Sequence, residues 1–156
     1  LDKVLPAIRK HSEDLREEEF FLSRNWIELR DEEDFHEVIL HVFDEGGEYV
    51  RSTNGNIECG EWRHMNGKFV YGSSSCDGEV FDLAFLDEEF FILKKHGNSR
   101  LFDRRYHVFI IEPLYRKLEW NEAVEYLFDK YRNSNGFLIT AALLLVMVIV
   151  LALLLS

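Results

Sequence analysis

Histidine and cysteine are the side chains of this chain with the widest range of site chemistry. The six histidines are His11, His36, His41, His64, His96 and His107. None of them forms a His-x-x-x-His pair and no Cys-x-x-Cys pair occurs, although metal ligands usually recur at such spacings. The chain also has no Gly-x-Ser-x-Gly motif, phosphate-binding loop or dinucleotide-binding motif. We therefore expect no bound metal, no cofactor and no enzymatic activity, and we expect His41 and His107 to be half-buried in strands.

The two cysteines are Cys59 and Cys76, and their pairing depends on the turn between them. Asn66-Gly67 is the strongest hairpin signal of the sequence, and a two-residue turn there sets Cys59 opposite Ser74. The two sulfurs then lie on neighbouring strands slightly out of register, and a bulge before Cys76 would bring them together. A disulfide and two small buried thiols both fit this pattern, and we favour the buried thiols.

Two acidic runs, residues 31–34 and 87–89, are the remaining candidates for ion binding. Neither run has the spaced oxygen ligands and the glycine of a calcium-binding loop. We therefore expect solvated turns that protect the edges of strands.

Aromatic residues are frequent in this chain, with 13 Phe, 6 Tyr and 3 Trp. This content is too high for a disordered segment and predicts a folded domain. Some of these rings can line an apolar ligand pocket or fill the core, and the core is the alternative that we favour. The candidates for the pocket are Trp62, Tyr71, Phe81, Phe85 and Phe91.

The pattern of elements predicts an α+β fold, an antiparallel β-meander or small barrel flanked by two helices. Amphipathic helices are expected over residues 6–22 and 119–132. The expected strands are 26–29, 37–43, 48–51, 57–65, 68–73, 80–86, 90–95 and 106–111. The chain then divides into an N-terminal helix (1–24), a β domain (25–112), a helix with a polar joint (113–135) and a transmembrane helix (136–156).

Residues 137–155 are apolar except for Thr140 and predict a single membrane span. At a helical rise of about 1.5 Å per residue they would extend roughly 28 Å, close to the thickness of a bilayer's hydrocarbon core. Residues representative of this lipid-facing segment are Phe137, Leu144, Met147, Ile149 and Leu154. Basic residues precede the segment and none follows it, so we expect a tail-anchored protein with its folded part in the cytoplasm.

The formal charge of −11 lies entirely before residue 133. An acidic surface argues against nucleic acid, which binds to basic stripes. It also argues against a domain that lies flat on anionic lipid. The acidic charge thus excludes nucleic acid as an expected partner. The apolar segment predicts membrane lipid and other membrane-protein subunits as partners, and the aromatic residues predict an apolar small molecule.

Four features of residues 26–111 resemble the lipocalin-like domains of small bacterial proteins. The stretch opens with a strand that begins at Trp26, and Phe43-Asp44-Glu45-Gly46-Gly47 follows as a hairpin. Gly60-Glu61-Trp62 leads a later strand, and Phe90-Phe91-Ile92-Leu93 resembles the strands that display the contents of such a barrel. The resemblance implies a small antiparallel barrel that binds an apolar ligand.

Two functions follow as hypotheses from the sequence. The first is a membrane-anchored, non-enzymatic interaction protein, an accessory subunit of a membrane complex. The alternative is a lipocalin-like binder of a small apolar molecule, tethered near the bilayer.

Overall fold

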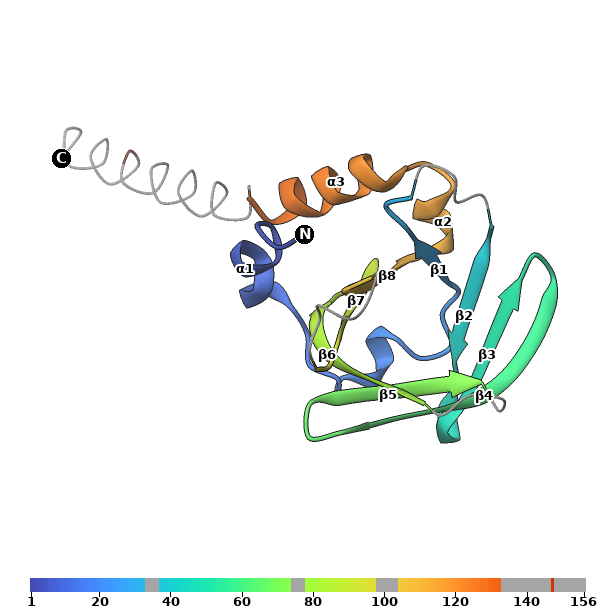
Figure 1. Cartoon of the computed structure of the whole chain (residues 1–156). Helices are drawn as coiled ribbons and strands as arrows, with labels where there is room; N and C mark the ends of the chain where they lie inside the picture. The colour runs from blue at the N-terminus through green and yellow to red at the C-terminus, as the bar shows by residue number, and fades with distance from the viewer. Residues whose placement is uncertain (33–36, 74–77, 98–103, 133–146, 148–156) are drawn as a thin grey trace.

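The computed structural model of the chain describes residues 1–32, 37–73, 78–97, 104–132 and 147. Eight strands form a closed antiparallel barrel, in which each strand pairs with its neighbours in sequence and β8 pairs with β1 (Figure 1). They are β1 (Trp26–Leu29), β2 (Ile39–Phe43), β3 (Glu48–Thr53), β4 (Asn56–Met65), β5 (Lys68–Ser73), β6 (Glu79–Leu86), β7 (Phe90–Lys95) and β8 (Tyr106–Ile111). The expected antiparallel meander is confirmed, and of the two alternatives the structure has the closed barrel.

The turn at Asn66 and Gly67 sets the register of the hairpin between β4 and β5. Both residues have positive φ, 53° and 73°, as the type I′ turn favoured by Asn-Gly requires. Met65 therefore faces Lys68, and Gly60 faces Ser73. This is the register that the sequence predicts.

Gly60 lies where the backbones of β4 and β5 are too close for a side chain. A Cβ added there would stand 1.9 Å from the carbonyl oxygen of Gly72. Gly60→Ala should therefore push the strands apart and lower the free energy of unfolding by about 1–3 kcal/mol or more. Urea denaturation measures this loss. Gly78→Ala is the control, because the nearest atom to its Cβ would be a Val70 side-chain carbon at 3.0 Å; equal stability of the two variants would contradict the prediction.

The N-terminal segment is not the single helix over residues 6–22 that the sequence predicts. The helix α1 (Leu5–Ile8) continues as one 3₁₀ turn, η1 (Arg9–His11), and Ser12 is then extended. The next element is a second 3₁₀ turn, η2 (Glu18–Phe20). The segment instead bonds to the end of β6, where Glu13 N–H donates to the Leu86 carbonyl (2.8 Å) and Leu86 N–H donates to Ser12 Oγ (3.0 Å). Tertiary hydrogen bonds thus replace those of a helix.

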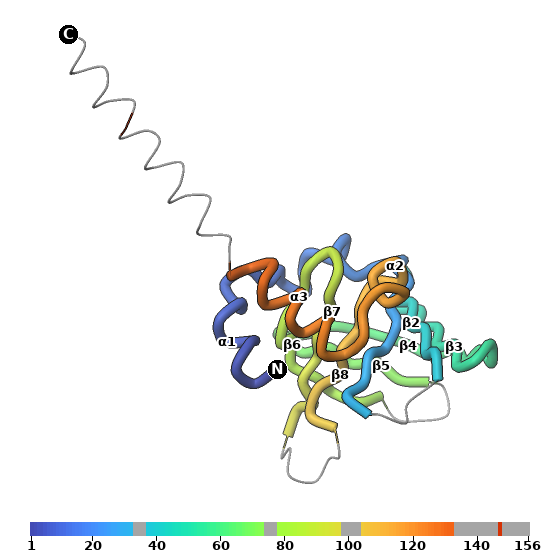
Figure 2. Tube along the Cα trace, turned by 90° about the horizontal axis from the view of Figure 1, so that it is seen from above, coloured from blue at the N-terminus to red at the C-terminus, as the bar shows by residue number. Residues whose placement is uncertain are grey.

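Two apolar cores hold this arrangement together, one inside the barrel and one outside it. The inner core is mostly aromatic and consists of Leu15, Phe21, Trp26, Phe43, Tyr49, Trp62, Phe69, Tyr71, Phe81, Leu86, Phe91, Leu93 and Phe109. Leu15 and Phe21 come from the N-terminal segment and close one end of the barrel. The outer core joins α1 and α3 (Trp120–Arg132) to Leu29, Phe85, Phe90, Ile92, Val108 and Ile110 on the strands. Figure 2 shows α1 and α3 side by side against the barrel.

Asp87 joins the turn between β6 and β7 to α3, and only 5% of it is exposed. Its Oδ1 accepts hydrogen bonds from the backbone N–H groups of Glu89 (2.8 Å) and Phe90 (2.6 Å). Its Oδ2 accepts from Lys130 Nζ (2.9 Å) and from the Tyr131 hydroxyl. The prediction of a solvated turn over 87–89 is therefore wrong for Asp87, because α3 covers it.

The short helix α2 (Glu112–Tyr115) and α3 follow the barrel, and α3 agrees with the helix expected over 119–132. The predicted transmembrane helix of residues 136–156 lies outside the described residues except for Met147, which is helical and 64% exposed. Phe137, Leu144, Ile149 and Leu154 are not among the described residues. Of the helices that are described, none combines the length and the apolar character needed to cross a membrane.

Candidate functional site: a polar cluster inside the barrel

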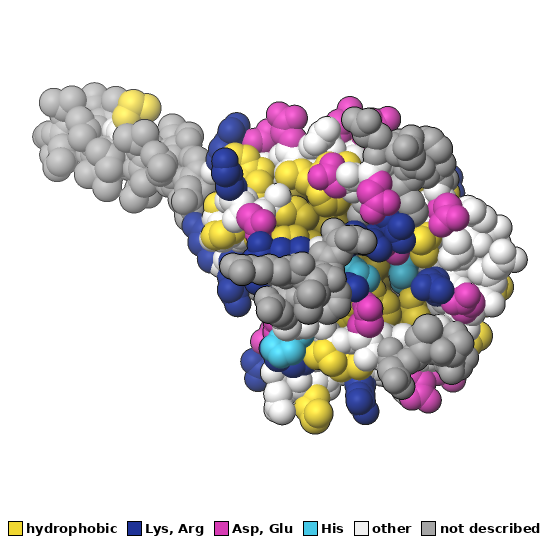
Figure 3. Space-filling view, viewed as in Figure 1, with side chains coloured by type: hydrophobic (Ala, Val, Ile, Leu, Met, Phe, Trp, Pro, Cys, Tyr) yellow, Lys and Arg dark blue, Asp and Glu magenta, His cyan; other side chains and the backbone are white. Residues whose placement is uncertain are grey.

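Polar side chains occupy inward-facing positions at one end of the barrel, opposite the end that Leu15 and Phe21 close. At this end β1, β3, β5 and β7 finish and β2, β4, β6 and β8 begin. We call its polar residues the polar end; they are Glu28, His41, Tyr49, Arg51, Tyr71, Arg104 and His107. In Figure 3 histidine side chains lie at the centre of one face of the molecule, with basic and acidic side chains around them.

A chain of three hydrogen-bonded groups forms the most buried part of the polar end. His41, 2% exposed, lies 3.0 Å from Glu28 Oε2 through Nε2 and 2.7 Å from the Tyr49 hydroxyl through Nδ1. An ionised carboxylate can only accept, so Nε2 carries the proton and Nδ1 accepts from Tyr49. Burial lowers the pKa of His41 and raises the pKa of Tyr49. At neutral pH the imidazole is therefore uncharged, and Tyr49 is not an activated nucleophile.

Glu28 is the only charge of this chain of groups, and it is 4% exposed. Its Oε1 accepts from Arg30 Nε (2.9 Å) and from Arg104 Nη1. Burial alone would raise the pKa of Glu28, but the hydrogen bond from His41, the charge of Arg104 and the hydrogen bond from Arg30 outweigh it. The pKa of this carboxyl therefore lies well below its ordinary value, and Glu28 is ionised.

Tyr71 and His107 form a second polar pair across the barrel. The Tyr71 hydroxyl lies 2.7 Å from His107 Nδ1. Burial raises the pKa of Tyr71, so its hydroxyl keeps its proton. The hydroxyl and the neutral imidazole can each donate or accept in this contact, and the tautomer of His107 sets the direction. Burial, together with the charge of Arg104, lowers the pKa of His107 to about 3.

His107 should make the stability of the protein fall as the pH falls from about 6.5 to 3. In that window the unfolded chain binds a proton that the folded chain, with its pKa of about 3, does not. The free energy of unfolding should therefore decrease by up to about 1.4 kcal/mol per pH unit from this group. Urea denaturation at several pH values measures the slope. His107→Gln should make the slope shallower; an unchanged slope would contradict the assignment.

Arg51 completes the polar end from β3, where it faces His41 across the strands. Its Nη2 donates to Glu58 on β4 (2.5 Å). Its Nε is buried and has no hydrogen-bond partner among the described residues. An unpaired buried donor costs free energy, so a ligand or water that accepts from it would be stabilised there.

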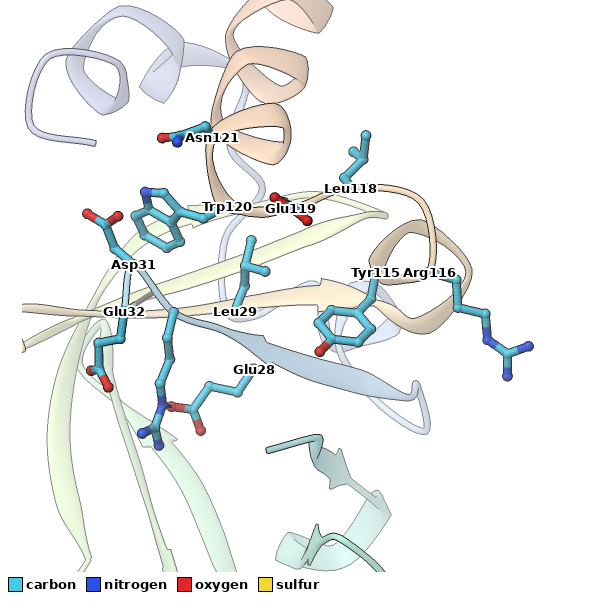
Figure 4. Close-up of a pocket in the computed structure, with 11 residues that line it drawn as sticks. Glu28, Leu29, Asp31, Glu32, Tyr115, Arg116, Leu118, Glu119, Trp120 and Asn121 are labelled. Atoms are coloured by element: carbon cyan, nitrogen blue, oxygen red, sulfur yellow. Dashed lines mark hydrogen bonds and ion pairs between the residues drawn. The ribbon is translucent and has the colours of Figure 1, made fainter. Parts of the chain in front are cut away.

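Two surface grooves reach the charged residues of the polar end. One of about 610 Å³ runs between β1 with the residues after it and the segment from α2 to α3, and Glu28 and Arg30 line it (Figure 4). In Figure 4 Leu29, Tyr115 and Trp120 stand around the same groove, and Asp31 and Glu32 stand on its β1 side. A second groove of about 320 Å³ is lined by Arg30 and Arg104. The residues that form the ion pairs of Glu28 therefore line grooves that open at the surface.

The structure divides the five aromatic residues that the sequence proposes as a pocket. Trp62, Tyr71, Phe81 and Phe91 lie together in the inner core, and Phe85 lies in the outer core against the helices. A bulge between Leu83 and Phe85 shifts the register of β6, which explains why Phe85 faces outward although Phe81 faces inward. Aromatic rings in edge-to-face and stacked contacts surround Phe43, the centre of the inner core. The polar end therefore lies next to the aromatic inner core.

Cys59 is a free, exposed thiol on β4, opposite Val50, and not the buried hydrophobic residue that the sequence favours. Cys76, the other half of the proposed disulfide, lies outside the described residues. The described ranges contain no group of three His, Cys, Asp or Glu side chains with the geometry of a metal site.

Glu28, Tyr49, Arg51 and Arg104 are the residues of this cluster that the sequence analysis does not identify. A signal for three of them is present in the strand alternation. Glu28 shares the inward parity of Trp26, and Tyr49 and Arg51 lie two residues apart on β3. A polar residue in phase with buried aromatic residues is the pattern that identifies them.

Comparisons of the chain with protein-family models, with curated proteins and with solved structures gave no match.

Proposed function

We propose that this chain is a membrane-tethered, lipocalin-like binding protein that holds a small molecule at the polar end of its barrel. The single observation that carries this proposal is the group of polar side chains, Glu28 and His41 above all, at buried inward-facing positions. Ligands often bind at the open end of a small barrel, because apolar side chains and a few polar groups line the same site there.

The free-energy cost of the polar end supports a functional role over a purely structural one. Burying a carboxylate and its ion-pair partners is often no more stabilising than apolar residues of the same volume. The rest of the barrel interior is filled by aromatic rings, which stabilise without desolvating any charge. Polar groups retained at one end of such an interior are therefore well explained by recognition of a ligand.

The close packing of the inner core also changes the chemical class of ligand that we expect. A deep apolar cavity for a wholly apolar molecule would need space where Phe43, Phe69 and Phe91, all fully buried, are packed together. The proposed ligand instead places polar groups against the polar end. The apolar segment of residues 137–155, which follows α3, would hold this barrel at a membrane.

The test is a fragment screen of the full chain in lipid nanodiscs with the six histidines isotopically labelled in the ring. Fragments of neutral, cationic and anionic character are added while the histidine signals are followed by NMR. We expect binding fragments to shift the signals of His41 and His107 and to leave that of His11, which stacks on Tyr131 in the outer layer, in place. A folded protein in which no fragment moves His41 or His107 would refute the proposal.

A second candidate, an accessory subunit of a membrane complex, is favoured by one observation on the outside of the barrel. Leu40, Val42, Val50, Ile57 and Cys59 form an outer patch on β2, β3 and β4, in which Val50 pairs with Val42 and Cys59 and Ile57 is 70% exposed. The helices pack on other strands, mainly β1 and β6–β8. Purification in mild detergent should co-isolate stoichiometric partners, and Ile57→Ser should release them while Met65→Ser, exposed but outside the patch, should not. A monomer without partners would count against this candidate.

A further inference from the structure

We infer that α1 and η1 form a surface that binds the anionic headgroups of a phospholipid membrane. This inference goes beyond the ligand of the polar end, and it rests on the membrane tether that is part of the proposed function. It is carried by three exposed cations, Lys3, Arg9 and Lys10, which we call the basic face. Their charge, their freedom from internal ion pairs in the described part of the chain and their place beside the end of α3 are the observations that support it.

The first twelve residues have a charge opposite to that of the whole chain. They contain the three cations of the basic face and a single carboxylate, Asp2, whereas the other residues contain 15 basic and 28 acidic side chains. Asp2 already accepts hydrogen bonds from Arg105 Nη1 (2.9 Å) and from the Tyr106 hydroxyl (2.7 Å). The acidic chain as a whole argues against a domain that lies flat on anionic lipid, but this small surface is basic and would be attracted to it.

The helical spacing of this segment places the basic face away from the barrel. Leu5 and Ile8 are 7% and 1% exposed and belong to the outer core. Lys3, Ala7 and Lys10 follow one another at a spacing of four and three residues and are all exposed. Residues at these spacings share one side of a helix, so the two lysines lie on the side opposite the outer core with Ala7 between them.

The cations of the basic face are available to an external anion. Within the described residues the side chains of Lys3, Arg9 and Lys10 form no ion pair and no hydrogen bond. Other exposed cations are paired inside the protein, as Arg16 is with Asp14 and Arg105 is with Asp2. A cation without an internal carboxylate keeps its full attraction for an anionic surface.

His11 holds this segment beside the end of α3 that precedes the apolar residues. Its ring stacks on that of Tyr131 with 4.8 Å between the centroids. Figures 1 and 2 both show α1 at the end of α3 that is farther from α2. Only residues 133–136 separate α3 from the apolar segment of residues 137–155, and a chain extends at most about 3.6 Å per residue. A membrane span of that segment would therefore begin within about 18 Å of the end of α3, and the headgroups would lie near α1.

The test uses the full chain in nanodiscs of phosphatidylcholine, prepared with and without phosphatidylserine. A gadolinium chelate on a small fraction of the headgroups broadens the NMR signals of groups close to the lipid surface, and the alanine methyl groups are isotopically labelled. The Ala7 methyl signal should broaden more strongly when phosphatidylserine is present. This difference should disappear at about 1 M salt, where the screening length is about 3 Å. Ala123, buried beneath α3, is the internal reference for an unchanged fold.

A double variant, Arg9→Gln with Lys10→Gln, should abolish the effect of phosphatidylserine on Ala7. Each cation near an anionic surface favours the bound state about five-fold, so the loss of two should lower the equilibrium constant for docking roughly 25-fold. The matched control is Arg63→Gln with Lys117→Gln, which changes the net charge of the chain by the same amount. Both control residues are exposed and form no ion pair among the described residues, and they lie on β4 and after α2. This control should keep the effect.

The outcomes separate this inference from the proposed function. If Ala7 broadens equally in both kinds of nanodisc, or if the control variant abolishes the effect as fully as the test variant does, the basic face does not bind headgroups. The membrane tether and the ligand of the polar end then stand. If the chain does not enter nanodiscs at all, the tether and this inference fail together. Ligand binding at the polar end is measured separately by the signals of His41 and His107.

Discussion

Glu28→Gln should lower the free energy of unfolding by about 3–5 kcal/mol, the usual cost of removing one partner from a buried ion pair. The amide has the shape of the carboxylate but carries no charge, so Arg30 and Arg104 lose the group that both of them bind. The amide has a single oxygen acceptor, so its NH2 group faces either the arginines or the Nε2–H of His41, and one of these donors loses its acceptor. Because the arginine side chains are 20% and 29% exposed, we expect the lower part of this range. Urea denaturation at pH 7 measures the change.

The control for this variant is Glu58→Gln, which removes an ion pair whose two side chains are 40% and 49% exposed. Exposed pairs contribute about 0–1 kcal/mol, so the control should lose little. A double variant, Glu28→Met with Arg104→Met, should recover part of the loss, because it removes the opposing charge as well. Equal stability of Glu28→Gln and Glu58→Gln would show that the buried carboxylate has no special role.

Asp87→Ala should destabilise the protein by a similar amount, about 3–5 kcal/mol, and should loosen α3 from the barrel. The substitution leaves the backbone N–H groups of Glu89 and Phe90 without their acceptor. It also removes the buried acceptor of Lys130 and Tyr131 on α3. Hydrogen–deuterium exchange should show faster exchange across α3, together with a lower midpoint of urea unfolding.

The matched control is Asp129→Ala, which removes an ion pair to Arg132 within α3 itself, where 45% of the Asp129 side chain is exposed. This variant should change stability by at most about 1 kcal/mol and leave the exchange of α3 nearly unchanged. If α3 exchanged at the same rate in Asp87→Ala and in Asp129→Ala, the apolar contacts of Ala123 and Leu127 would be enough to hold α3 on the barrel.

The attachment of α3 to the barrel depends on several separate contacts. The segment of residues 137–155 follows α3 in the sequence, and α3 is joined to the barrel by Asp87, by Tyr126 bonded to Glu89, and by the outer core. Asp87→Ala should therefore loosen α3 while leaving the polar end, which is built from other residues, intact.

Local sequence patterns determined most of the β-structure of this protein. Six of the expected strands agree with the structure, four of them in full (β1, β5, β7 and β8) and two within one residue (β4 and β6). The Asn66-Gly67 turn is determined locally, because only a few residue pairs adopt two positive φ angles at low cost. The aromatic content and the alternation along the strands also predicted the filled interior. Each of these features depends on residues that are neighbours in the chain.

The N-terminal segment and the turn at Asp87 were decided by tertiary structure instead. Residues 6–22 have the apolar spacing of a helix, but Leu15 and Phe21 are buried inside the barrel, and Leu86 replaces helical hydrogen-bond partners. Asp87 has the sequence context of a solvated turn, yet Lys130 and Tyr131 of α3, which follow it by 43 and 44 residues, cover it. Such outcomes follow from contacts between distant segments, which local propensity does not encode.

The candidate site is also a feature that tertiary structure decided. Glu28, His41, Arg51, Tyr71 and His107 come from five different strands, and each is an ordinary polar residue in its own strand. Strand alternation can tell which side of the sheet they face, but only the closure of β8 onto β1 brings Glu28 near Arg104 and sets the hydrogen bonds. The sequence by itself therefore determined the strands and the core, whereas the polar end exists only in the folded barrel, because closure decides which inward-facing groups meet.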